Sequence, residues 1–272
     1  MAKQPTCTLI ISTYNWPKAL NLVLLSVLNQ RQLPTEIVIA DDGSKEETKN
    51  LIDSYRDKFS IPIKHVWHED EGFRLAKIRN KAIATALGDY IIQIDGDVIL
   101  HPYFIKDHLD FAKKNTLVRA SRIYINNKSS AQLLNAEKYN INAFSKGVTN
   151  FFSALRLPFL WPIFEKNYKN KGSERFEIHG CNMAFWRKDA IAVNGYNENF
   201  NGWGPEDKEF VARLLNIGVQ KRFLKMGAIV FHIYHTENSK NYLAENENEF
   251  KKTITENRIE CSLGINQYLH EE

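Results

Sequence analysis

The chain has 272 residues, a formal net charge of +4, 43% hydrophobic residues and 25% charged residues. This composition is ordinary for a soluble globular protein, and so small a net charge gives no reason to expect a nucleic-acid-binding protein. No apolar run is long enough to cross a bilayer, residues 1–6 carry no signal-peptide pattern, and three widely spaced cysteines indicate neither a disulfide framework nor a zinc site. We therefore expect a cytoplasmic protein.

The first hundred residues alternate between predicted strands and predicted helices. We expect strands at 7–12, 36–40, 61–67 and 90–95, and helices at 17–30, 44–55 and 75–87. Pro17 suits the first turn of its helix, and Ser44 with Glu47 forms a capping box for the next one. Short turns between alternating elements predict a mainly parallel, doubly wound sheet.

Polar side chains follow three of these strands. They are Ser12, Tyr14, Asp41, Asp42, Asp95 and Asp97. Because the carboxyl ends of parallel strands share one edge of a sheet, we expect these side chains to gather there. Two carboxylates two residues apart repel each other unless a cation neutralises them, and Mg²⁺ or Mn²⁺ bound to a nucleotide diphosphate fits that need. A plain surface turn is the alternative for Asp95-Gly96-Asp97 alone, because Asp and Gly are common turn residues.

A nucleotide base fits the same edge. A carboxylate can accept the N3–H group of uracil, and the ring of Tyr14 can stack on the base. Arg74 could balance phosphate charge, although a solvated helix face is the commoner role of a single arginine. The chain contains neither a P-loop nor a dinucleotide fingerprint, so a metal ion would have to neutralise the phosphates.

Four motifs in this half carry a family resemblance. They are Ile11-Ser12-Thr13-Tyr14-Asn15, Ile39-Ala40-Asp41-Asp42-Gly43-Ser44, Arg79-Asn80 and Ile94-Asp95-Gly96-Asp97. In this order and spacing they resemble the nucleotide half of family two glycosyltransferases of GT-A fold. The resemblance implies a UDP-sugar donor and Mn²⁺ or Mg²⁺. It implies that Ser12, Tyr14 and Asp42 bind the base, a role that Asp41 could share. It also implies that Arg74 lies near the nucleotide, that Asp95 lies near the ribose, and that Asp97 ligates the metal.

The second half is less regular. We expect helices at 102–114 and 205–215, strands at 117–125 and 228–231, and a polar helix at 241–263. The stretch 126–171 reads as a variable helical insertion, with a helix at 130–144. Its aromatic run at 150–164, followed by Lys166, Lys169 and Lys171, suits either contact with a membrane interface or a helical subdomain packed on the core, and we favour the second.

The sequence Asn201-Gly202-Trp203-Gly204-Pro205-Glu206-Asp207 precedes an apolar helical stripe. Acids commonly complement a helix N-terminus, but that role does not explain an aromatic residue on flexible backbone. The segment resembles the Trp-Gly-x-Glu-Asp motif of β-1,4-galactosyltransferases and bacterial chondroitin-polymerase-type transferases, apart from Pro205, where Gly is often found. The resemblance implies that Asp207 is the base of an inverting transfer and that Trp203 and Glu206 bind the acceptor. Related retaining enzymes carry Asn in place of Asp207.

Two histidines, His232 and His235, follow the last predicted strand. A lone histidine is more often structural or exposed, but imidazole is a good ligand for transition metals. Galactosyltransferases place metal-ligating histidines after such a strand. The resemblance therefore implies that His235, His232 or both join Asp97 on the metal, which favours Mn²⁺ over Mg²⁺.

The sequence predicts one α/β domain of GT-A fold, with a nucleotide-sugar-binding half at 1–100, an acceptor-binding and catalytic half at 101–240 and a C-terminal helix at 241–272. The predicted reaction is an inverting, metal-dependent transfer from a UDP-sugar to a saccharide or lipid-linked saccharide in surface polysaccharide or glycolipid synthesis. The expected place is the cytoplasm, with possible peripheral contact at the inner face of the membrane. The alternatives are a retaining glycosyltransferase, a non-catalytic sugar- or nucleotide-binding module, and a nucleotidyltransferase, whose Gly-rich loop is missing.

Overall fold

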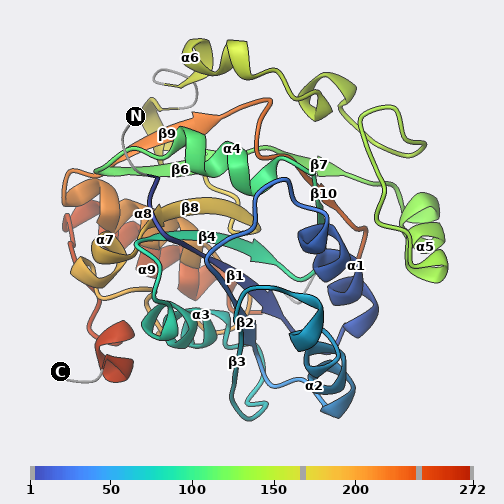
Figure 1. The fold of residues 1–272 in the computed structure, drawn as a ribbon. Coiled ribbons are helices and arrows are strands. Elements are labelled where there is room, and N and C mark those ends of the chain that lie inside the picture. The colour runs from blue at the N-terminus through green and yellow to red at the C-terminus, as the bar shows by residue number, and fades with distance from the viewer. Residues whose placement is uncertain (1–3, 166–169, 237–240, 270–272) are drawn as a thin grey trace.

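A seven-stranded sheet forms the centre of the computed structural model, which describes residues 4–165, 170–236 and 241–269 (Figure 1). The strand order is β3-β2-β1-β4-β8-β6-β9. The strands are β1 (Cys7–Thr13), β2 (Glu36–Asp41), β3 (Ile63–Trp67), β4 (Tyr90–Asp95), β6 (Thr116–Ala120), β8 (Asn182–Trp186) and β9 (Gln220–Leu224). All neighbours pair parallel except β8, which runs antiparallel to both β4 and β6. The prediction of a mainly parallel α/β sheet is confirmed.

Helices cover both faces of this sheet. They are α1 (Pro17–Leu28), α2 (Glu46–Asp53), α3 (Leu75–Thr85), α4 (Phe104–Phe111), α7 (Arg187–Ala192) and α8 (Glu206–Asn216). The helix α9 (Leu243–Thr255) packs on α8. Leu9 and Ile11 of β1 pack with α1, α2 and α4, whereas Ile10 faces the core formed with α3, α7 and α8. Because successive side chains of a strand point to opposite faces, one short apolar run supplies both cores.

A smaller sheet lies beside the main one. It has the order β5-β10-β7 and consists of β5 (Val98–Leu100), β7 (Arg122–Tyr124) and β10 (Val230–His232). The prediction of one strand at 117–125 is therefore wrong, because the chain changes sheets at Ser121. There the hydroxyl of Ser121 accepts a hydrogen bond from Met226 N (3.2 Å), and its carbonyl accepts one from Asn182 Nδ2 (2.8 Å). These bonds hold the bend between the sheets.

Three predicted helix ends are also wrong. The capping box does not form: α2 starts after Lys45 without a side-chain cap, and Ser44 Oγ accepts a hydrogen bond from Asn15 N (2.8 Å) instead. The helix expected at 130–144 is α5 (Asn127–Ala136), which begins earlier because Asn126 Oδ1 accepts Ser129 N (2.9 Å). The polar C-terminal helix is also shorter than expected and ends at Thr255.

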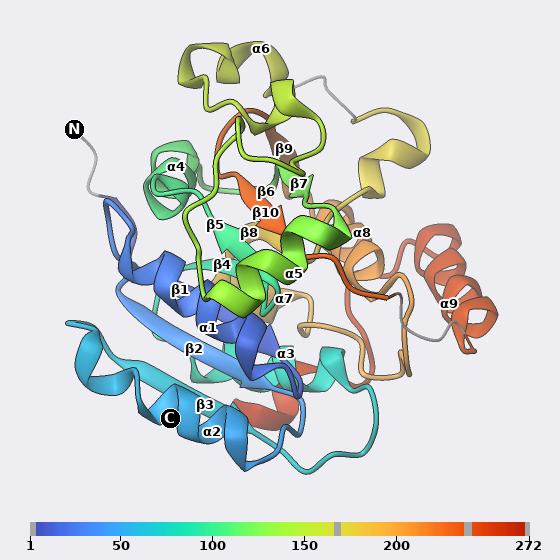
Figure 2. The ribbon, with the colours of Figure 1, turned by 90° about the vertical axis from the view of Figure 1, so that its right-hand side faces the viewer.

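Residues 137–165 form a lobe at the outer edge of the molecule, and its end with α6 lies above β9 in both ribbon views (Figures 1 and 2). Only the 3₁₀ turns at 151–154 and 158–160 and the short α6 (Trp161–Phe164) are helical there. Arg156 anchors the lobe through the buried carboxylate of Asp107 on α4 (2.6 Å), and Trp161 Nε1 donates to Met226 O (3.1 Å). The lobe therefore packs on the core with Trp161 on its inner side, while Lys166 and Lys169 lie outside the described residues.

Outside the lobe, a 3₁₀ helix at 172–176 leads into β8, and another at 265–268 packs against α3 through Ile265. Among the described residues, no helix combines the length and the apolar character needed to cross a membrane.

Candidate functional site

A cleft of about 800 Å³ opens where β1, β2 and β4 end and α8 begins. Most of the residues predicted for a site line it, although they come from opposite ends of the sequence. They are Ser12, Tyr14, Asp42, Asp95, Asp97, Trp203, Glu206, Asp207, His232 and His235. The expectation that acidic strand ends would meet at one edge of the sheet is thus met by the geometry.

The structure does not bring Asp41 and Arg74 into the cleft lining. The Asp41 carboxylate is buried, where it accepts Ser44 N (2.8 Å) and pairs with His65 Nε2 (2.9 Å). The Arg74 guanidinium contacts Asn201 Oδ1, and its backbone N–H donates to Asp42 Oδ2 (2.9 Å). Neither residue lines the cleft, but each orders a part of its surroundings. Asp41 holds the turn after β2, and the backbone N–H of Arg74 holds the carboxylate of Asp42.

Asp42 and Tyr14 form one end of the cleft. Asp42 is buried and its Oδ1 lies 2.7 Å from His68 Nε2, a partner that sequence reasoning missed. Tyr14 is half exposed, and its hydroxyl donates to Asp70 Oδ2 (2.8 Å), which raises the pKa of Tyr14. The tethered ring and the fixed carboxylate together can offer a stacking face and a hydrogen-bond acceptor to a planar N–H-bearing base.

Asp97, His232 and His235 form a candidate metal centre. Within this group, one potential ligand atom from each side chain lies within 4.8 Å of the others. The small sheet creates the arrangement, because β10 pairs antiparallel with β5 and places His232 opposite Val98, next to Asp97. Asp97 Oδ1 is buried without a hydrogen-bond partner, as expected of an oxygen that faces a cation. These oxygen and imidazole donors fit Mn²⁺.

The two histidines of this centre differ electrostatically. A hydrogen bond with Asp97 (3.1 Å) raises the pKa of His235 to about 9, whereas burial lowers the pKa of His232. His235 Nδ1 lies 2.8 Å from the carbonyl of Thr236, which can only accept, so the Nε2 atom is the one left for a metal when the ring is neutral. A metal ion bound here would displace a proton from His235 and take over its attraction to Asp97.

Arg79 of α3 lines the cleft, and although it belongs to one of the motifs of the family resemblance, no role was predicted for it. Its side chain is 1% exposed. The guanidinium contacts Asp207 Oδ1 (2.9 Å) and Asp95 Oδ1 (3.0 Å). Its sequence signal was an arginine between Ile78 and Ala82 on the buried side of a helix, a position where an unpaired charge would be costly.

Asp207 and Glu206 stand side by side at the start of α8 in different surroundings. Asp207 Oδ1 also accepts the hydroxyl of Tyr196 (3.2 Å), and a Cβ atom at Gly180 would lie 2.0 Å from its Oδ2. Burial, and then the neighbouring Asp207, raise the pKa of Glu206 to about 8, and its Oε2 is buried without a partner. The pair can therefore offer a carboxylate as a base beside a protonated acid that donates a hydrogen bond.

The loop before α8 presents Trp203, which is 40% exposed, to the cleft. Gly202 has a φ of +63°, and Asn246 of α9 donates to the carbonyls of Asn201 (2.9 Å) and Trp203 (3.3 Å). The helix α9 thus holds this loop and adds Glu247 to the lining. Sequence reasoning gave α9 no part in the site.

Comparison with known proteins agrees with this arrangement. The family model described as glycosyl transferase family 2 matches residues 8–193, and the model described as the N-terminal domain of galactosyltransferase matches residues 164–236. The chain is 30% identical over 240 residues to a chondroitin synthase of Pasteurella multocida and 28% identical over 239 residues to one of Escherichia coli. Each match covers 83% of the chain but only 24% and 34% of those proteins, so the chain spans a quarter to a third of their length.

Solved structures show the same fold at low sequence identity. S. aureus TarS in complex with UDP-GlcNAc superimposes with a TM-score of 0.66 at 16% identity, covering 97% of this chain and 69% of that one. The mannosyltransferase PcManGT from Pyrobaculum calidifontis, in complex with GDP-Man and Mn²⁺, gives 0.60 at 16% identity, covering 87% and 59%. The prediction of a GT-A-type fold is confirmed.

The contact between Gly180 and Asp207 predicts a mutational effect. Gly180→Ala should push the carboxylate out of position and slow the consumption of a nucleotide sugar about tenfold or more, because small misplacements of a reacting group are costly. Gly218→Ala is the control: it meets no neighbouring atom but has a φ of +87°, so it should lower the melting temperature and leave the rate unchanged. Equal rates for wild type and Gly180→Ala would show that the Asp207 position is unimportant.

Proposed function

Because the chain belongs to glycosyl transferase family 2, we propose that this glycosyltransferase moves a sugar from a UDP-sugar to a saccharide hydroxyl with inversion and with the help of Mn²⁺. The observation that carries the proposal is that one cleft holds a base-binding end, a candidate metal centre and an acid pair beside an exposed tryptophan. A neighbour in fold binds UDP-GlcNAc and another binds GDP-Man with Mn²⁺, which supports a metal-bound nucleotide sugar as donor.

The residues divide the work along the cleft. Asp42 accepts the uracil N3–H, and Tyr14 stacks on the ring, which places the ribose near Ser12 and Asp95. Asp97, His232 and His235 would hold Mn²⁺, which when bound supplies positive charge for the leaving diphosphate.

The acceptor sugar binds at the part of the cleft that is lined by Trp203, Glu206 and Asp207. Trp203 stacks on the acceptor sugar, and the protonated carboxyl of Glu206 donates a hydrogen bond to one of its oxygens. Asp207 removes the proton from the attacking hydroxyl, whose oxygen then forms the new bond to the anomeric carbon on the face opposite the leaving UDP. Attack from that face inverts the anomeric centre.

The base assignment predicts the effect of Asp207→Asn. Transfer should fall about 10²- to 10⁴-fold, because an amide cannot take the proton, while the affinity for UDP with Mn²⁺ stays within about twofold. A scan of UDP-sugars by differential scanning fluorimetry, with and without Mn²⁺, selects the donor, and UDP release then gives the rate. Asp57→Asn, an exposed acid outside the cleft, is the control.

Near wild-type transfer by Asp207→Asn would refute the base. NMR of the anomeric proton in the product distinguishes inversion from the alternative, a retaining transferase.

The metal centre predicts that Asp97→Ala removes the part of UDP binding that depends on Mn²⁺. Isothermal titration calorimetry should show tighter UDP binding with Mn²⁺ than with EDTA for the wild type, by about tenfold or more, and no difference for the variant. The exposed Asp110→Ala serves as control. If Asp97→Ala keeps the full Mn²⁺ effect, the metal binds elsewhere.

The outer lobe supports peripheral contact with a membrane. Its side chains Phe144, Phe152, Phe159 and Ile163 are between 69% and 80% exposed. The exposed Lys138 and Lys146 lie in the same lobe, and aromatic residues beside lysines suit an anionic lipid interface.

Flotation with anionic liposomes tests this contact. Replacing Phe152 and Phe159 by Ser should abolish co-flotation, because the apolar anchors are lost, whereas Ile259→Ser, an exposed residue outside the lobe, should not. Equal flotation of wild type and the double variant would exclude the lobe as the contact.

A further inference from the structure

We propose that Arg79 is a positioning residue for the transfer: its buried guanidinium holds the Asp207 carboxylate charged and turned toward the acceptor. This inference rests on the proposed role of Asp207 as the base. It gives a function to a residue that links two parts of the proposed site. Of its two partners, Asp95 is assigned to the nucleotide side and Asp207 to the acceptor side.

The hydrogen bonds around Asp207 define an orientation. Its Oδ1 receives two donors, Arg79 Nη1 at 2.9 Å and Tyr196 Oη at 3.2 Å. Among the described residues no donor reaches Oδ2, which lies against Gly180 in the cleft lining. One oxygen is therefore fixed by the protein, and the other is left to accept a proton from an acceptor hydroxyl.

The charges around Asp207 require a cation. Asp95 of β4 and Glu206 of α8 face it together with the hydroxyl of Tyr196, so its surroundings are otherwise acidic. Burial alone would lower the pKa of Arg79, but the carboxylates of Asp207 and Asp95 raise it above its ordinary value, so the guanidinium stays charged. Without this cation, the carboxylates of Asp95 and Asp207 would face each other in a partly buried site with no counter-charge.

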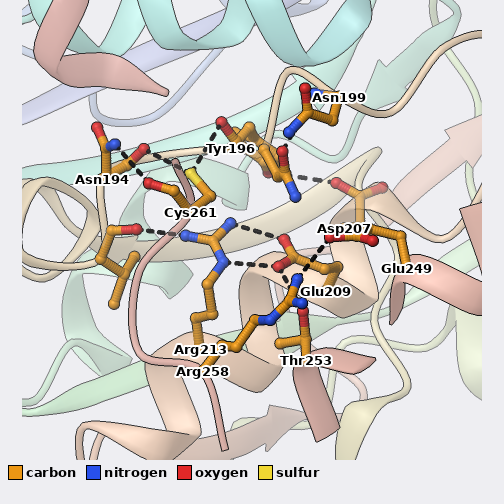
Figure 3. Close-up of polar contacts among 12 residues, drawn as sticks. Asn194, Tyr196, Asn199, Asp207, Glu209, Arg213, Glu249, Thr253, Arg258 and Cys261 are labelled. Carbon is orange, nitrogen blue, oxygen red and sulfur yellow. Dashed lines mark hydrogen bonds and ion pairs between the residues drawn. The ribbon is translucent and has the colours of Figure 1, made fainter. Parts of the chain in front are cut away.

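Arg213 provides a control, because it is a second buried arginine and belongs to α8 itself, the helix that carries Asp207 (Figure 3). Its guanidinium forms two hydrogen bonds with Glu209 of α8, at 2.8 and 2.7 Å, and Thr253 of α9 also donates to Glu209 (3.0 Å). In the same view Asp207 is bonded to Tyr196 and takes no part in the Arg213 pair. Loss of the Arg213 fork should therefore weaken the fold without touching Asp207.

The first experiment needs no donor sugar. The ¹³C carboxyl resonance of Asp207, assigned by its loss in Asp207→Asn, is titrated between pH 3 and 9 in the full chain, in wild type, Arg79→Met and Arg213→Lys. We expect the midpoint to rise by about one pH unit in Arg79→Met, because an opposite charge has been removed, and to stay at the wild-type value in Arg213→Lys. Coinciding midpoints in wild type and Arg79→Met would overturn the inference.

The second experiment separates orientation from charge and serves if Arg79→Met does not fold. Arg79→Lys keeps the charge but loses the fork, and Tyr196→Phe removes the other donor to Oδ1. We expect both to lower kcat for UDP release about 10- to 100-fold, with the titration midpoint unchanged in Arg79→Lys and the donor KM within about threefold in Tyr196→Phe. A wild-type kcat in both variants would overturn the orienting role.

The two proposals fail differently. If Asp207→Asn transfers sugar normally, the base assignment is wrong whatever Arg79 does. If Asp207→Asn is inactive but the Arg79 variants match Arg213→Lys in kcat and midpoint, the proposed function stands and the positioning role is refuted.

Discussion

The molecule depends on balancing acids that the fold forces together. Parallel strands end at one edge, so the turns after β2 and β4 deliver Asp42, Asp95 and Asp97 to the same cleft into which α8 directs Glu206 and Asp207. Leaving so many acids without counter-charges in a partly buried space would be costly. The balance comes from Arg79, which lies between Asp95 and Asp207, and from His235 beside Asp97.

The small sheet explains how the candidate metal centre combines residues from two distant parts of the chain. Asp97 comes directly before β5, and β10, more than a hundred residues later, pairs with β5 in a register that sets His232 beside it. Ile233 N also donates to Asp97 O (2.9 Å), so the backbone itself carries the acid and the imidazoles at fixed separation. Three short strands thus assemble the candidate metal centre, because they join two distant segments of the chain at one point.

Local patterns predicted what depends on local sequence. The alternation of strands and helices before residue 100 and the polar groups at the strand ends could be read directly, since β-branched runs and turn residues act within a few positions. The split at Ser121 could not, because strands as short as β7 show no periodicity and their pairing is set by Asn182 and by β10. The capping box predicted at Ser44 does not form for a similar reason. The backbone N–H of Asn15, which is distant in sequence, donates to the hydroxyl that a capping box would use.

Two neighbouring acids show what the structure adds to the sequence motif that contains them. Glu206 and Asp207 share a helix terminus, whose dipole treats both alike. Yet Arg79 Nη1 lies 2.9 Å from Asp207 and 3.7 Å from Glu206, and burial raises the pKa of Glu206 to about 8. One guanidinium thus lies nearer to one of two adjacent carboxylates. A motif in the sequence can show that two carboxylates are present, but only the fold brings the arginine from α3 to one of them.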